Sequence, residues 1–201
     1  LAPPCSSEAV PTPPVTPSPT PAPQCQWWYP LDSVGPPWSW VREDAGGWST
    51  AARPGYLRLL TLPGDLAGVQ NDARNLLLQP LPTGNFEVST RLSFAPALQG
   101  QTAGLLLYQD DDNYVFLGRA HDQGSKVIFV AERGGAREVH ALDFGGVATH
   151  LRIIRNGTSF TGYYGVTADT PIRVFEYQAG MTAFRMGLAP GAHPLPSWRR
   201  V

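Results

Sequence analysis

The sequence predicts an all-β domain built from two antiparallel sheets and preceded by a proline-rich spacer. Apolar and polar residues alternate through residues 86–94 (FEVSTRLSF), which is the period of a strand with one buried face. The other apolar runs are short and end at turn residues, such as the acidic residues 110–113 (DDDN) and Asn156-Gly157. Because none of these runs has helical period, we expect strands throughout.

Length and composition limit the class of protein. A chain of 201 residues fits one domain with an appendage, and a net charge of −1 with 15% charged residues predicts no general affinity for nucleic acid or an anionic membrane. No apolar stretch is long enough to cross a bilayer. Since the chain begins with Leu rather than Met, we expect that a leader or an upstream region precedes it.

The first segment, residues 1–26, differs in kind from residues 27–201. Proline recurs every two or three residues in PTPPVTPSPTPAP, which fixes φ, removes amide donors and favours an extended spacer. The alternative is a disordered terminus without a partner. We expect residues 27–201 to form the folded domain.

Cys5 and Cys25 flank the spacer and are the only cysteines. In a secreted protein the pair can close a disulfide, which would stabilise the fold by about 3 kcal/mol. The stiffness of the intervening prolines opposes that closure, so pairing stays open. Neither cysteine has the spacing of a zinc site.

In the first half of the domain, Trp38 and Trp40 have the same parity on a strand, which favours packing over stacking on a sugar. Pro54-Gly55 predicts a type II turn before a strand within residues 53–62. A looser loop follows over residues 63–75. Leu76, Leu77 and Leu78 then form a strand that prolines end.

The second half reads as a series of hairpins. Residues 102–109 return through the acidic turn, and Gly134-Gly135 and Asn156-Gly157 join later pairs. The expected strands are residues 102–109, 114–120, 126–132, 138–143, 150–155, 159–166, 173–178 and 181–188.

The succession RPGYLRL, N-x-LLLQ, FEVSTRLSF, GQTAGLLLYQDDDNY and LRIIRNG, within residues 38–187, resembles the concanavalin A-like accessory domain at the C-terminus of glycoside hydrolase family 43 β-xylosidases. It also resembles laminin-G-like modules. The resemblance implies a concanavalin A-like jelly-roll sandwich of two antiparallel sheets attached to carbohydrate enzymes. The family's Tyr-Ser-x-Asp-Gly turn is replaced here by residues 164–169 (YGVTAD), which puts any role of that loop in doubt.

Catalysis has little support in the sequence. Jelly-roll glycosidases place carboxylates as Glu-x-Asp-x-x-Glu, and that spacing does not occur. Residues 110–112 read as a solvated hairpin, and the four histidines are scattered. We therefore expect a non-catalytic domain that requires no cofactor. Because laminin-G-like domains often carry calcium, the resemblance allows a structural calcium ion, whose ligands the sequence does not identify.

If the domain binds sugar, it needs an aromatic platform and planar polar side chains. On the outward parity of the central strands these are Arg91, Tyr108 and Arg119, with Gln109 and Asn113 near the rim. The alternatives are that Tyr108 packs in the core and that Arg91 only forms an ion pair with Glu87, two pleats away on its strand.

Three functions follow. The first is a non-catalytic carbohydrate-binding module of an extracellular polysaccharide-degrading or cell-surface system, tethered to a catalytic domain and recognising xylan or arabinan. The second is a structural or protein-interaction domain. The third is a glycan hydrolase or lyase, which needs a pocket with a carboxylate pair or a Tyr or His base. We expect a secreted monomer.

Overall fold

The computed structural model of the chain describes residues 31–81, 83–181 and 184–192. The expected spacer, Cys5 and Cys25 lie outside these residues. Regular structure in the described part is β, apart from one 3-10 turn at Ala45–Gly47. The predicted all-β class is therefore confirmed.

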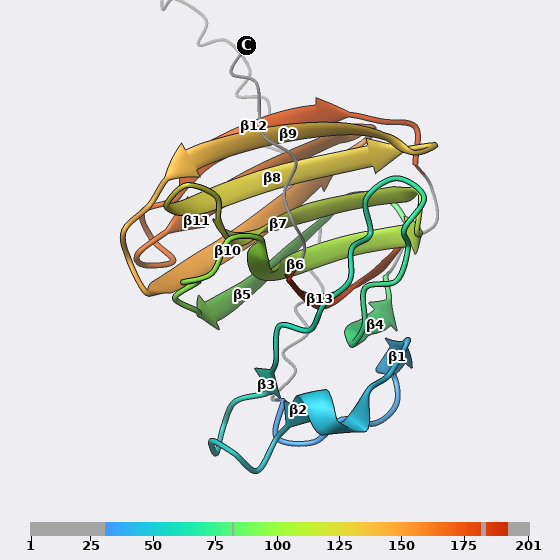
Figure 1. Cartoon of the computed structure of the whole chain (residues 1–201). Helices are drawn as coiled ribbons and strands as arrows, with labels where there is room; N and C mark the ends of the chain where they lie inside the picture. Colours follow the sequence, from blue (N-terminus) through green and yellow to red (C-terminus); the bar gives the residue numbers. More distant parts are fainter. Residues whose placement is uncertain (1–30, 82, 182–183, 193–201) are drawn as a thin grey trace, which may run out of the picture.

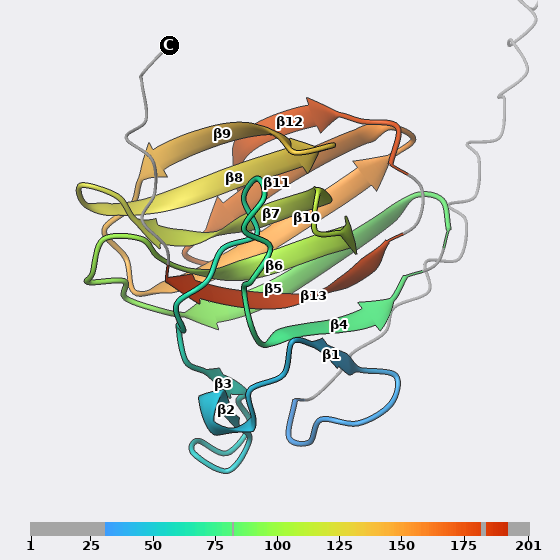
Figure 2. The same cartoon turned by 45° about the vertical axis from the view of Figure 1, so that its right-hand side comes forward.

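The strands form two main antiparallel sheets, which pack face to face (Figures 1 and 2). The larger sheet has seven strands in the order β1-β4-β13-β6-β7-β8-β9: β1 (Ser39–Val41), β4 (Leu76–Pro80), β13 (Arg185–Ala192), β6 (Gln101–Asp110), β7 (Asn113–His121), β8 (Ser125–Arg133) and β9 (Ala136–Asp143). The smaller sheet has the order β12-β11-β10-β5: β12 (Ile172–Gln178), β11 (Ser159–Gly165), β10 (Ala148–Asn156) and β5 (Phe86–Ser93). A separate pair, β2 (Trp48–Ser49) and β3 (Arg58–Leu59), lies below the sheets in Figure 1.

The turns follow the predicted turn residues. Gly134, Gly135 and Gly157 have φ of 56°, 77° and 60°, which a residue without Cβ adopts at little cost. They join β8 to β9 and β10 to β11. Gly55 has φ of 77° within a turn closed by Tyr56 N donating to Arg53 O at 3.1 Å, as a type II turn requires.

The main core lies between the two sheets. Alternate residues of β5, beginning with Phe86 and Val88, turn inward while Glu87 and Arg91 turn to solvent, so the predicted alternation is confirmed. From the seven-stranded sheet, Leu117 of β7 and Phe129 of β8 are fully buried in this core. This inner packing fixes which side chains remain for the outer faces.

The outer face of the seven-stranded sheet is also partly buried. Residues 62–75 cross it, and Leu66 and Ala73 from this segment pack with outward residues of β6, β7 and β8 in a second apolar cluster. Figure 2 shows the segment lying over these strands. Burial on both faces explains why β6 and β7 have continuous apolar sequences rather than alternation.

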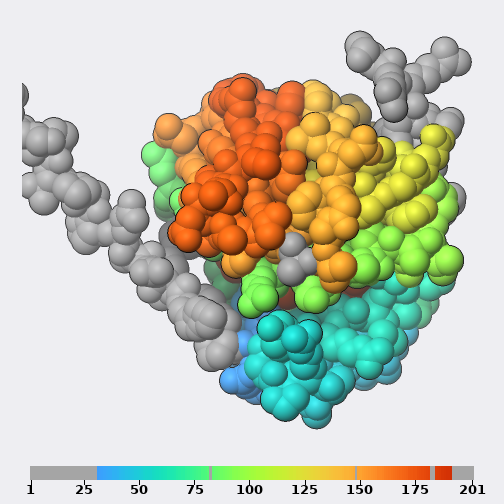
Figure 3. Space-filling view, turned by 90° about the vertical axis from the view of Figure 1, so that its left-hand side faces the viewer, coloured from blue at the N-terminus to red at the C-terminus, as the bar shows by residue number. Residues whose placement is uncertain are grey.

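Loops from both sheets close one end of the sandwich. Residues 94–100, 144–147 and 165–172 meet there, and Figure 3 shows the green, gold and orange segments side by side. The contacts that join them include Phe94 N donating to Val147 O at 3.1 Å and an edge contact between the rings of Phe144 and Tyr164 at 5.4 Å.

Trp40 and Trp48 pack together in a small lobe below the sheets. The Trp40 and Trp48 rings lie 5.0 Å apart with an interplanar angle of 32°, and both side chains are half-buried. The Trp48 indole N–H donates to Glu43 Oε1 at 3.1 Å. These contacts agree with the packing interpretation of Trp40.

Candidate functional site

A buried carboxylate holds residues 62–75 against the sheet. Glu132, the last outward residue of β8 before its turn, is 0% exposed. Gly68 N donates to its Oε1 at 3.1 Å and the Tyr114 hydroxyl donates to its Oε2 at 3.0 Å. The crossing segment is therefore tied to β7 and β8 by hydrogen bonds to a charged acceptor, which are stronger than neutral ones.

The electrostatics of this pair follow from burial. Burial raises the pKa of the Glu132 carboxyl, although the Tyr114 hydroxyl and the Gly68 amide oppose the shift. Burial and the neighbouring carboxylate both raise the pKa of Tyr114. Tyr114 therefore keeps its proton and donates a hydrogen bond, which is unfavourable for a general base.

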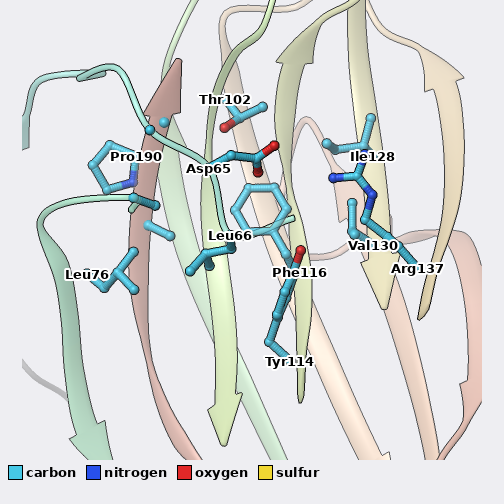
Figure 4. A pocket seen from close by; sticks show the side chains of 14 residues that line it. Asp65, Leu66, Leu76, Thr102, Tyr114, Phe116, Ile128, Val130, Arg137 and Pro190 are labelled. Atoms are coloured by element: carbon cyan, nitrogen blue, oxygen red, sulfur yellow. The ribbon is translucent and has the colours of Figure 1, made fainter. Parts of the chain in front are cut away.

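The segment also shapes a pocket on this outer face (Figure 4). The pocket has a cavity volume of about 50 Å³ and is open to solvent. Its apolar surface comes from strands and the segment, and its polar groups come from Asp65, Thr102, Tyr114 and Arg137. The lining residues are Gly64, Asp65, Leu66, Ala73, Leu76, Thr102, Tyr114, Phe116, Ile128, Val130, Arg137, Ala189, Pro190 and Gly191.

Small residues make this hollow possible. Ala189 and Gly191 on β13 and Gly64 on the segment place little bulk along one side. On β7, a Cβ at Gly118 would lie 2.5 Å from Phe116 Cζ, so the absence of a side chain lets the Phe116 ring lie along its own strand. The ring then forms part of the apolar lining of the pocket.

A second polar cluster lies beside the acidic hairpin. Tyr108, which is 5% exposed, donates its hydroxyl to Asp111 Oδ1 at 2.8 Å, and Arg42 binds both oxygens of Asp111 at 2.8 and 2.9 Å. Arg42 also donates through Nε to Ala73 O at 2.6 Å. Asp111 thus links the β6–β7 turn to the end of β1 and to the crossing segment, a role that a solvated hairpin does not have.

These contacts shift the titration of the cluster. Burial opposes ionisation of Asp111, but hydrogen bonds from Arg42 and Tyr108 outweigh it and lower the pKa of the carboxyl. Burial, followed by the hydrogen bond to Asp111, raises the pKa of Tyr108 to about 12. The cluster is a fixed structural joint at neutral pH.

The five candidate sugar-binding residues do not meet at one surface. Arg91 is exposed on the outer face of the four-stranded sheet, whereas Tyr108 is packed in the second apolar cluster. Gln109 and Asn113 are half-buried at the β6–β7 hairpin, where Asn113 donates to Asp110 Oδ1 at 2.7 Å.

Arg119 lies elsewhere again, since it has the inward parity of Leu117 and is 1% exposed. Its guanidinium, whose pKa is lowered by burial, donates to Gly146 O, to Phe144 O at 3.2 Å and to Thr149 Oγ1 at 3.2 Å. It closes the loop end of the sandwich. The expected shared outward face of Arg91, Tyr108 and Arg119 is therefore wrong, while sugar contact by any of the five stays a prediction.

The pocket residues were missed by sequence reasoning. Asp65 lies in a segment interpreted only as a loose loop, and Arg137 follows a turn. One signal was present: Glu132 ends the apolar run KVIFVAE, and a charged residue at the outward parity of a buried strand needs a partner.

Within residues 31–81, 83–181 and 184–192, no group of three His, Cys, Asp or Glu side chains is placed to hold a metal ion. A structural calcium ion stays a prediction. The same residues contain no helix long and apolar enough to cross a membrane.

The fold and the pocket together define a class of protein. Two main antiparallel sheets, with a small pocket on the outer face of the larger one, form a concanavalin A-like sandwich, and among the described residues Asp65 is the one carboxylate that lines this pocket. The chain belongs to the family described as the β-xylosidase C-terminal concanavalin A-like domain, whose model matches residues 30–183. The domain in this family is a non-catalytic accessory domain of family 43 glycoside hydrolases.

Solved structures show the same fold. The GH43 BlXynB protein from Bacillus licheniformis has 23% identity and a TM-score of 0.75 over 84% of this chain and 37% of that chain. A xylan β-1,4-xylosidase from Bacillus halodurans C-125 has 18% identity and a TM-score of 0.69 over 86% of this chain and 38% of that one.

This chain thus spans little more than a third of the length of those two proteins. A functionally unknown protein from Saccharomyces cerevisiae has 12% identity and a TM-score of 0.60, and 86% of its chain is covered. No curated protein matches the sequence.

Proposed function

We propose that the domain is a non-catalytic carbohydrate-binding accessory module, which holds a sugar of a xylan- or arabinan-type polysaccharide in the outer-face pocket. It would act as a secreted or cell-surface monomer beside a family 43 catalytic domain. The observation that carries this proposal is the pocket itself, whose lining combines apolar side chains with carboxylate, hydroxyl and guanidinium groups.

The chemistry of the pocket suits a sugar. A pyranose or furanose ring presents C–H groups on one face and hydroxyls at its edge. Phe116 and Ile128 offer apolar contact, while Asp65, Thr102 and Arg137 offer acceptors and donors at the rim. Because the pocket is small and open to solvent, we expect it to contact one sugar at a chain end or side branch rather than to enclose a chain.

Affinity gel electrophoresis against xylan, arabinoxylan and arabinan tests the proposal. We expect retardation by at least one of them, and a roughly tenfold weaker effect for Asp65→Asn, because loss of a charged hydrogen-bond partner costs about 1.5 kcal/mol or more. Asn keeps an acceptor for the Ala67 amide, which Asp65 Oδ1 binds at 2.9 Å, so the fold should persist. Asp169→Asn, an exposed residue outside the pocket, is the matched control. No retardation by any of the three glycans would overturn the proposal.

A second candidate function, docking on a protein partner, is favoured by a different observation. Seven large apolar side chains are exposed in the described residues, and six of them lie at or beside the loop end of the sandwich. The six are Leu60, Leu98, Leu142, Val147, Val166 and Ile172, and we call them the apolar end.

The three loops that carry most of the apolar end have little charge. Leu98 N and Thr61 Oγ1 both bind the Gln101 side chain, and Ile172 pairs with Tyr164, whose ring contacts Phe144. Residues 94–100, 144–147 and 165–172 contain a single ionisable side chain, Asp169. Clustered exposed apolar residues with little charge are typical of protein interfaces.

The partner that the family description indicates is a glycoside hydrolase catalytic domain. We expect a separately produced family 43 catalytic domain to bind this chain, and Val147→Ser with Val166→Ser to weaken that binding at least tenfold. Glycan retardation should be unchanged in the same variant. Equal binding of the variant and the parent would refute the assignment of this surface.

A further inference from the structure

The outer face of the four-stranded sheet carries a basic cluster that the pocket does not use. Outward parity places Arg91 on β5, His150 and Arg152 on β10, and Tyr163 on β11 on this face, because their neighbours in sequence are in the core. The face also bears short polar side chains such as Ser89 and the carboxylates of Glu87 and Glu176.

The charges on this face are unevenly compensated. Arg152 lies 3.5 Å from Glu87 Oε1, and Arg173 lies 3.4 Å from Glu176 Oε2. Arg91, in contrast, has no hydrogen-bond or ion-pair partner among the described residues, and it stands opposite His150 in the β5–β10 register. An exposed guanidinium without a protein partner favours a ligand that supplies negative charge.

An aromatic platform lies within reach of this charge. The Arg152 guanidinium carbon is 5.1 Å from the centre of the Tyr163 ring, and Tyr163 is half-buried. Tyr163 is two strands from β5 in the order β11-β10-β5 and, because Arg91 lies opposite His150 and His150 opposite Gly165, it is also two residues away along the strand, which together correspond to about 12 Å at ordinary strand dimensions. That separation suits two sugars that lie two positions apart along one chain, one stacked at Tyr163 and the other beside Arg91.

We propose that this face, defined by Arg91, His150, Arg152 and Tyr163, is a second binding surface for polysaccharides that carry uronic acid residues. The carboxylate of the uronic acid pairs with Arg91, and a sugar two positions along the chain packs on Arg152 and Tyr163. A guanidinium suits this task because its planar fork binds a carboxylate through two hydrogen bonds. The net charge of −1 for the whole chain opposes general attraction to polyanions, so recognition depends on this local arrangement.

The experiment uses one polysaccharide in two forms. Xylan substituted with glucuronic acid, and the same xylan after chemical reduction of its carboxyl groups, are compared by affinity electrophoresis or calorimetry. We expect the acidic form to bind at least tenfold more tightly, Arg91→Gln to abolish that difference, and added salt to weaken binding of the acidic form alone. Arg173→Gln, which removes an arginine already near Glu176, is the matched control and should have little effect.

Several results would overturn the proposal. Equal affinity for the two xylans, an unaltered affinity in Arg91→Gln, or equal retention of dextran sulfate would each do so, the last because it indicates charge attraction alone. Thermal unfolding of Arg91→Gln checks the fold. Since Asp65→Asn alters the pocket and Arg91→Gln alters the opposite sheet, failure of one site is distinguishable from failure of the other.

Discussion

Glu132 gives the sharpest prediction about the architecture that forms the pocket. Replacing it with Ala removes the acceptor for both Gly68 N and the Tyr114 hydroxyl. A hydrogen bond to a charged group contributes about 1.5 to 3 kcal/mol, so we expect Glu132→Ala to lower the free energy of unfolding by roughly 3 to 5 kcal/mol. For a domain of this size that is a fall in Tm of roughly 6–20 °C.

The assay is urea and thermal unfolding combined with amide hydrogen exchange. Exchange should quicken first in residues 62–75, because the tie to Glu132 is lost there, and later in the strands of the inner core. Tyr114→Phe, which removes one of the two bonds, should show a smaller loss of about 1 to 3 kcal/mol. A loss below about 1 kcal/mol for Glu132→Ala, or unchanged exchange in the segment, would refute the role of this carboxylate.

Glu132→Gln isolates the charge from the hydrogen bonds. Burial raises the pKa of Glu132 above its ordinary value of 4.5, so the folded state holds a proton more tightly than the unfolded state. The contribution of this group to stability is therefore fully present below pH 4.5 and declines as pH rises through the folded pKa. Glu132→Gln should remove that decline, which unfolding measured over a series of pH values will show. A decline of the same size in the variant would contradict this explanation.

Three further predictions concern the frame around the site. Arg119→Met should lower the free energy of unfolding, measured by urea unfolding, by about 3 to 5 kcal/mol, because it leaves buried carbonyls without donors. A loss below about 1 kcal/mol would contradict the role of Arg119 in holding the loop end of the sandwich closed. Asp111→Asn should destabilise the fold by about 1 kcal/mol at pH 7, because the ion pair with Arg42 is lost. Since the pKa of Asp111 is lowered from 3.8, the difference in stability between variant and parent should vanish as pH falls through the folded pKa. A difference that stays constant with pH would contradict this explanation. Gly118→Ala should lower the free energy of unfolding by more than about 2 kcal/mol, because the added Cβ would lie 2.4 Å from a carbonyl oxygen of the facing strand. Gly35→Ala, where the added Cβ meets open space, should lower it by less than about 1 kcal/mol. Similar Tm values for the two variants would refute the packing argument.

The strands and turns were predictable because their signals are local. Alternation in β5 and the glycines of the turns after β8 and β10 depend only on neighbouring residues, and the register follows from them. The placement of residues 62–75 was not predictable. This segment has no period of its own, and its position is set by Glu132, which is far away in the sequence.

The alternation of residues along a strand predicted the orientation of some candidate site residues but not of others. Residues 114–120 are apolar on both faces of β7, so the pattern does not reveal which parity points inward. Arg119 was expected on the outward parity of the central strands, yet it points inward, where carbonyls and a hydroxyl at the loop end accept its hydrogen bonds. In β5 one face is polar, and there the outward position of Arg91 was correct. The ion pair considered between Arg91 and Glu87 was not correct, because Glu87 Oε1 lies 3.5 Å from Arg152 instead.

A titration of the ¹⁵N-labelled domain with neutral arabinoxylan oligosaccharides tests the proposed function most directly. We predict saturable shifts of amide signals around Thr102, Phe116 and Arg137, with little change at the apolar end or on the four-stranded sheet. Absence of saturable shifts at these three positions, at any oligosaccharide concentration up to its solubility, would contradict sugar binding by the outer-face pocket.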